Sequence, residues 1–75
     1  MLKSGQTVLF SRQVKELVAY VVRNDAGGKM LMGRLSVPQD LASREAMRAF
    51  LMAQVAPKGI TVVSDPDDPH TFDLV

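Results

Sequence analysis

The most apolar stretch of the chain, residues 17–22, has a hydrophobic side chain at every position and is rich in β-branched and aromatic residues. A stretch this short, without glycine or proline, favours a β-strand over a helix. Residues 24–28 then supply two glycines and two turn-forming side chains, and residues 29–37 alternate as a strand does. The pattern predicts a β-hairpin. Its second strand is expected to present two opposite faces, with Leu31, Gly33, Leu35 and Val37 on one and Met30, Met32, Arg34 and Ser36 on the other.

A single long helix is predicted from Asp40 to Ala56, in a segment rich in alanine, leucine, methionine, arginine and glutamate. Pro38 ends the preceding strand and suits the first turn of a helix, where Ser36 or Asp40 can cap the free amides. Residues 57–59, with their proline and glycine, end the helix. The spacing of the apolar positions predicts a buried stripe made of Met47, Phe50, Leu51 and Val55.

The remaining strands are shorter. Residues 60–63 predict a third strand, residues 64–69 a turn rich in aspartate and proline, and residues 70–75 a closing strand. Residues 7–10 can add another strand at the start. The order (β)ββαββ predicts a small two-layer α+β domain, an antiparallel sheet of four or five strands with one helix over one face. At 75 residues, the whole chain, 1–75, is expected to form a single domain.

The second face of this sheet needs an explanation, because the strand at residues 17–23 is apolar on both sides. Either the N-terminal segment folds over that face, or Tyr20 and its row meet another protein chain. The interface is then expected to comprise Val18, Tyr20, Val22, Met30 and Met32. Unbranched methionines repack against varied partners, although a place in the core or scattered on the surface is the alternative for them.

Composition limits the class of protein. The chain has no cysteine, which excludes a disulfide framework and a thiolate zinc site, and so short a chain without such a staple is marginal as a monomer. No apolar run is long enough to cross a membrane, and the N-terminus lacks the pattern of a signal peptide. We therefore expect a soluble, cytoplasmic, complete small protein from a bacterium or phage.

The charges are unevenly divided. Residues 1–48 hold eight of the nine lysines and arginines and four acids, whereas residues 49–75 hold one base and four acids. A basic half can bind nucleic acid, and Lys15, Arg23, Arg34, Arg44 and Arg48 are the candidate phosphate contacts. The chain has no aromatic platform pattern, however, and its net charge is only +1. An ordinary solvated surface is the simpler interpretation.

Two short motifs could suggest chemistry, but neither predicts a site. His70 follows three aspartates, at positions 65, 67 and 68, yet the prolines among them indicate a rigid turn and the spacing matches no calcium loop. Residues 27–29, Gly-Gly-Lys, lead into a strand rather than the helix that a phosphate-binding loop requires. We predict no catalytic residue, no metal site and no cofactor.

These observations favour a non-enzymatic protein-interaction or regulatory module, homodimeric or docked on a larger partner through a sheet face or edge. The alternative is a small nucleic-acid-binding domain that uses the basic N-terminal half and the helix arginines. An enzyme is disfavoured, because so small a domain with one histidine offers few convergent polar groups for a pocket.

Overall fold

The computed structural model of the chain describes residues 2–75 and has the predicted α+β class. Within residues 2–75, five strands and one α-helix follow one another in the order βββαββ. A 3-10 turn, η1, extends the end of the helix. The elements are β1 (Gln6–Arg12), β2 (Leu17–Asp25), β3 (Gly28–Leu35), α1 (Arg44–Val55), η1 (Ala56–Lys58), β4 (Val62–Asp65) and β5 (Asp68–Leu74).

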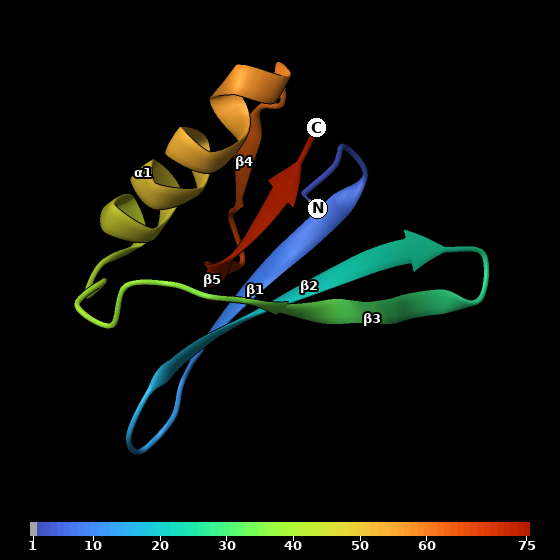
Figure 1. Cartoon of the computed structure of the whole chain (residues 1–75). Coiled ribbons are helices and arrows are strands. Elements are labelled where there is room, and N and C mark those ends of the chain that lie inside the picture. The colour runs from blue at the N-terminus through green and yellow to red at the C-terminus, as the bar shows by residue number, and fades with distance from the viewer. Residues whose placement is uncertain (1) are drawn as a thin grey trace.

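The five strands form one antiparallel sheet in the order β3-β2-β1-β5-β4, with the helix on one side of it (Figure 1). The strand expected at residues 7–10 is confirmed and is longer, and β1 is the central strand. It pairs along its whole length with β2 and, over Thr7 to Leu9, with β5. The N-terminal segment is therefore part of the sheet and does not fold over its second face.

The helix begins at Arg44, four residues later than predicted, because Ser43 provides the N-cap: its hydroxyl accepts a 3.1 Å hydrogen bond from the Ala46 amide. Ser36 and Asp40 lie in the irregular segment before it. Two side chains hold this segment in place. Gln39 bonds both the amide and the carbonyl of Leu17, at 2.7 and 3.0 Å, and the Arg12 guanidinium donates to the carbonyl of Leu41 at 3.1 Å.

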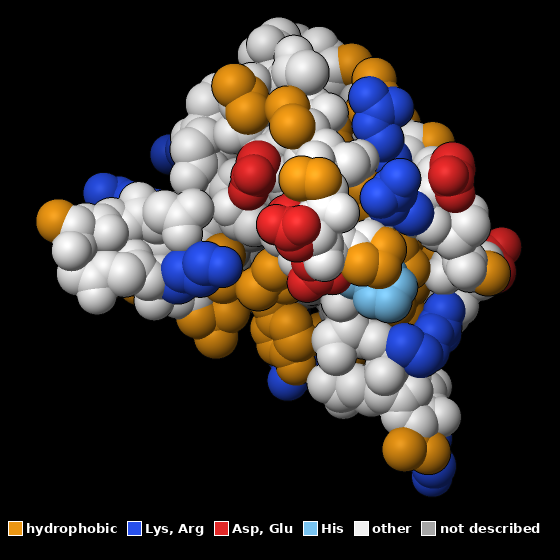
Figure 2. All heavy atoms as spheres, turned by 180° about the vertical axis from the view of Figure 1, so that it is seen from behind, with side chains coloured by type: hydrophobic (Ala, Val, Ile, Leu, Met, Phe, Trp, Pro, Cys, Tyr) orange, Lys and Arg blue, Asp and Glu red, His pale blue; other side chains and the backbone are white. Residues whose placement is uncertain are grey.

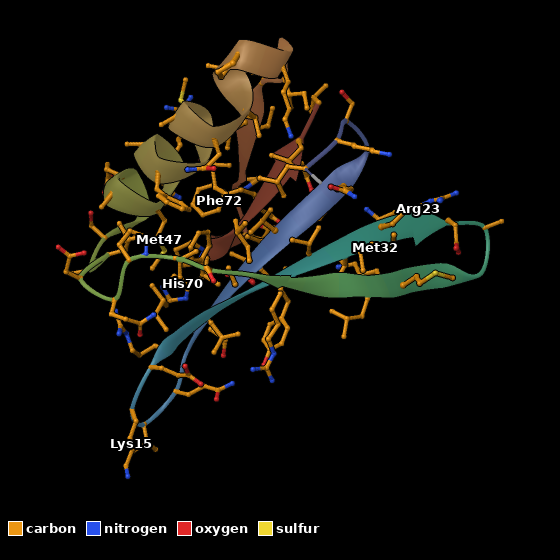
Figure 3. All side chains as sticks on the ribbon, in the orientation of Figure 1. Lys15, Arg23, Met32, Met47, His70 and Phe72 are labelled. Carbon is orange, nitrogen blue, oxygen red and sulfur yellow. The ribbon has the colours of Figure 1, made fainter. Side chains whose placement is uncertain are left out.

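The core lies between the helix and the sheet. Met47, Leu51 and Val55 of the predicted stripe are buried there, whereas Phe50 is only half-buried at its margin. Phe10 and Phe72 meet edge to face, with ring centroids 5.7 Å apart. Figure 3 shows Met47 and Phe72 between α1 and the sheet. The core residues are Leu2, Val8, Phe10, Leu17, Ala19, Val21, Leu41, Met47, Leu51, Val55, Val62, Phe72 and Leu74.

A β-bulge interrupts β3 and changes which side chains face which way. Val21 lies opposite Gly33, but the next residue of β2, Val22, lies opposite Leu31, so Met32 is the extra residue. The alternation predicted for residues 29–37 is therefore wrong before Gly33. Leu31 shares a face with Val22, and Met30 shares the other face with Arg23, its partner across the ladder.

The last two strands form a tight hairpin with only Pro66 and Asp67 in its turn. Two aspartates shape it: the Asp65 carboxylate accepts from the Asp67 amide at 2.8 Å, and the Asp68 carboxylate accepts from the His70 amide at 2.9 Å. The sequence predicted a turn here, but its bounds of 64–69 were too wide: β4 lies two residues later than the predicted strand 60–63, and β5 begins two residues before position 70. Within residues 2–75, no helix has the length and apolar character needed to span a membrane.

Candidate functional site

The face of the sheet that points away from the helix is here called the open face. Strand alternation and the observed register assign its residues. It comprises Thr7, Leu9 and Ser11 of β1, Val18, Tyr20, Val22 and Asn24 of β2, Lys29, Leu31 and Arg34 of β3, Val63 of β4 and Thr71 and Asp73 of β5. The helix packs against β4 and β5 from the opposite side, so it does not cover this face. The N-terminal segment does not cover it either, because its strand β1 lies within the sheet.

Three of the five predicted interface residues, Val18, Tyr20 and Val22, lie together on the open face. Val18 and Val22 are only 5% and 6% exposed, because their neighbours within the chain already bury them. Tyr20 is half-buried: the Arg34 guanidinium lies 5.5 Å from the centre of its ring, and its hydroxyl accepts a 3.1 Å hydrogen bond from Gln13. Of the three, Tyr20 has the most surface to offer a partner.

The other two predicted residues, Met30 and Met32, do not share a face with Tyr20; they lie on either side of Leu31 along β3. Met30, Leu31 and Met32 are 53%, 62% and 49% exposed, and they are consecutive on β3, an edge strand of the sheet. We call these three residues the hairpin patch. Placing the methionines beside Tyr20 was wrong because the bulge at Met32 reverses the alternation. Figure 2 shows hydrophobic side chains along the underside of the projecting β2–β3 hairpin.

Leu31 was missed as a surface residue, since strict alternation put it in the core. The signal that could have identified it is Gly33, because a glycine inside a strand pattern often marks a bulge. Gly33 has a φ of +152°, a conformation that residues with a Cβ rarely adopt.

The β5 side of the open face is polar. The Thr7 hydroxyl donates to the Asp73 carboxylate at 2.8 Å and accepts from the Asn24 side chain at 3.3 Å, so a hydrogen-bonded network links β2, β1 and β5. This network satisfies the buried hydroxyl of Thr7. Of the large apolar side chains exposed within residues 2–75, three are consecutive on β3, and the others lie singly at Val14, Met52, Val63 and Val75.

The five candidate phosphate contacts do not lie on one surface. Lys15, in the β1–β2 loop, and Arg23 lie near opposite ends of β2 (Figure 3). Arg34 is on the open face, whereas Arg23 is on the other face. Arg44 and Arg48 are exposed on the helix. On the side of the molecule drawn in Figure 2, lysines and arginines lie in several separate places, with other side chains between them.

His70 lies at the rim of a hollow of about 250 Å³ that Phe10, Leu17 and Met47 also line. These apolar walls are almost wholly buried already, so they leave little surface for a ligand. The hydrogen bond from the His70 amide, followed by one from Thr71, lowers the pKa of Asp68 below its ordinary value. Among residues 2–75, no group of three or more histidine, cysteine or acidic side chains could hold a metal ion.

In comparisons with protein-family models, curated proteins and solved structures, nothing matched this chain. Its surface is therefore the basis for a functional proposal.

Proposed function

We propose that this chain is a non-enzymatic protein-interaction module that docks through the hairpin patch and the adjoining Tyr20 of the open face. The observation that carries the proposal is the exposure of three consecutive apolar residues on an edge strand. Leu31 projects from the open face, whereas Met30 and Met32 border the same strand on the other face, so exposed apolar side chains lie on both sides of the free edge of β3. Large apolar side chains scattered singly over a surface need no explanation, but an edge strand bordered in this way is typical of a strand-pairing site.

The patch combines two features of such a site. Burying a side chain such as Leu31 stabilises a complex by about 1–2 kcal/mol, in proportion to the apolar area removed from water. The two methionines add adaptable contact area, since an unbranched thioether fits differently shaped partners. An edge strand also has unpaired backbone groups with which a partner can form hydrogen bonds. The partner is either a second copy of the chain or a different protein.

The test compares Leu31→Asp with Met52→Asp. Met52 is an exposed apolar residue on α1, away from the patch, so its substitution is a matched control for the added charge. Association is measured by analytical ultracentrifugation for a homodimer and by affinity capture for a different protein, and circular dichroism checks the fold. We expect Leu31→Asp to abolish association and Met52→Asp to preserve it. A monomer without a partner, or association that survives Leu31→Asp, would contradict the proposal.

Nucleic-acid binding is the second candidate, and Arg44 and Arg48 favour it in one respect: they are exposed one turn apart on α1. If they bind phosphates, replacing both with alanine weakens binding to all sequences alike and reduces its dependence on salt. A protein that binds neither mixed DNA nor mixed RNA at low salt would eliminate this candidate.

A further inference from the structure

We propose that the occupant of the hairpin patch is an extended segment of a different protein, added beside β3 as a sixth strand, in which apolar residues are flanked by carboxylates. This inference rests on the proposed interaction function. It goes further by specifying the chemistry of the partner and the geometry in which it binds.

The backbone of β3 provides the first argument. Asp25 and Gly28 face each other across a two-residue turn, a position at which antiparallel strands exchange both hydrogen bonds. Along an antiparallel ladder, hydrogen-bonded pairs alternate with pairs that are not hydrogen-bonded. The pair Met30 and Arg23 is therefore of the hydrogen-bonded kind, whereas Lys29 and Leu31 belong to the other kind. The amide and carbonyl groups of Lys29 and Leu31 consequently point away from β2. Since β3 is an edge strand, these groups are free to bond an incoming strand.

The side chains of β3 provide the second argument, which is charge complementarity. On the open face, Leu31 lies between two exposed cations, Lys29 and Arg34. On the other face, the side-chain contacts available at the edge are those of Met30 and Met32. A matching strand therefore has apolar residues opposite the patch and an acidic residue toward each end.

A second copy of the chain fits this edge less well. A symmetric antiparallel pair centred on Leu31 would bring two Lys29 and two Arg34 side chains into one short ribbon. Like charges gathered in this way oppose pairing. A lysine and a β-bulge on an edge strand are also features that discourage self-association. An acidic partner strand, in contrast, is attracted by Lys29 and Arg34.

The experiment is a selection from a phage-displayed library of random short peptides on the immobilised full-length protein. We expect the enriched peptides to share a short apolar core with an acidic residue on each side. The Lys29→Glu/Arg34→Glu variant, altered only at exposed positions, is expected to select basic flanks instead. No enrichment, or enrichment without an acidic bias, would overturn the inference.

The backbone geometry is tested with Leu31→Pro against Leu31→Ala. Both variants lose the leucine side chain, but only proline removes the outward amide, and an edge strand tolerates proline there. Leu31→Pro is expected to weaken binding of an enriched peptide about tenfold beyond Leu31→Ala, through the loss of a main-chain hydrogen bond. Equal binding by the two variants would overturn strand addition. If Leu31→Asp still abolishes association while these tests fail, the interaction function stands and only the strand-addition inference is wrong.

Discussion

Gly33 determines which side chains of β3 are available to a partner. Its positive φ permits the bulge, and the bulge turns Leu31 from the core side to the open face. Strand alternation alone could not predict this, because one extra residue in a strand reverses the face on which each preceding residue of that strand lies. At this scale, the difference between a core leucine and a surface leucine depends on one glycine two residues further along the chain.

Gly33→Ala is expected to destabilise the fold by about 1–2 kcal/mol, because a residue with a Cβ rarely adopts this backbone conformation. No heavy atom lies within 4 Å of the added Cβ, so the cost is conformational rather than steric. Gly27→Ala is the control, since Gly27 has no positive φ and its Cβ would make only an ordinary 3.5 Å contact with Asp25. Urea denaturation measures both variants. Equal stability of the two would contradict the role given to Gly33.

Asp68 makes stability depend on pH in a definite direction. Hydrogen bonds from the His70 amide and then Thr71 favour the carboxylate, so the folded-state pKa lies below the ordinary value of 3.8. Its contribution is present above pH 3.8 and is lost as the pH falls through the lower, folded-state pKa. The urea midpoint should therefore fall in acid, and Asp68→Asn should reduce that fall. An unchanged acid profile in Asp68→Asn would show that this carboxylate contributes nothing.

Among the elements, the hairpin and the helix were the most predictable, because each has a sustained hydrophobic period. The start of the helix was less predictable, because three residues before it have side chains that can cap a helix: Ser36, Asp40 and Ser43. The tertiary structure selects Ser43. The order of the strands in the sheet could not be predicted from the sequence either. The segment that seemed optional, β1, is the central strand, since its apolar residues Val8 and Phe10 are few in number but face the core.

Leu51, rather than Phe50, is expected to be the more critical residue of the helix. Leu51 is fully buried against the sheet, so Leu51→Ala should cost about 3–5 kcal/mol from lost burial and a residual cavity. Phe50 is half-buried, and Phe50→Ala should cost roughly half as much because solvent already reaches part of the ring. Thermal melts followed by circular dichroism rank the two variants. A greater loss in Phe50→Ala would mean that the helix packs with a different face.

At the scale of the whole molecule, the core occupies one side of the sheet, and the proposed docking site lies at its β3 edge. The helix lies over one face of the sheet (Figure 1) and makes the core with it, while Met30, Leu31 and Met32 of β3 are left exposed. A single short helix cannot cover five strands on both sides. We infer that a partner completes the burial that one helix leaves undone.

The four methionines at positions 30, 32, 47 and 52 allow the most direct test of the hairpin patch as the docking surface. Met30, Met32 and Met52 are exposed, whereas Met47 is buried. Peroxide oxidation, read by mass spectrometry at each position, is compared between the purified protein and the protein in an extract of the cells that produce it. We expect the extract to slow oxidation of Met30 and Met32 but not of Met52, with Met47 slow in both samples. An extract that slows oxidation of Met30, Met32 and Met52 by the same factor, or of none of them, would contradict this docking surface.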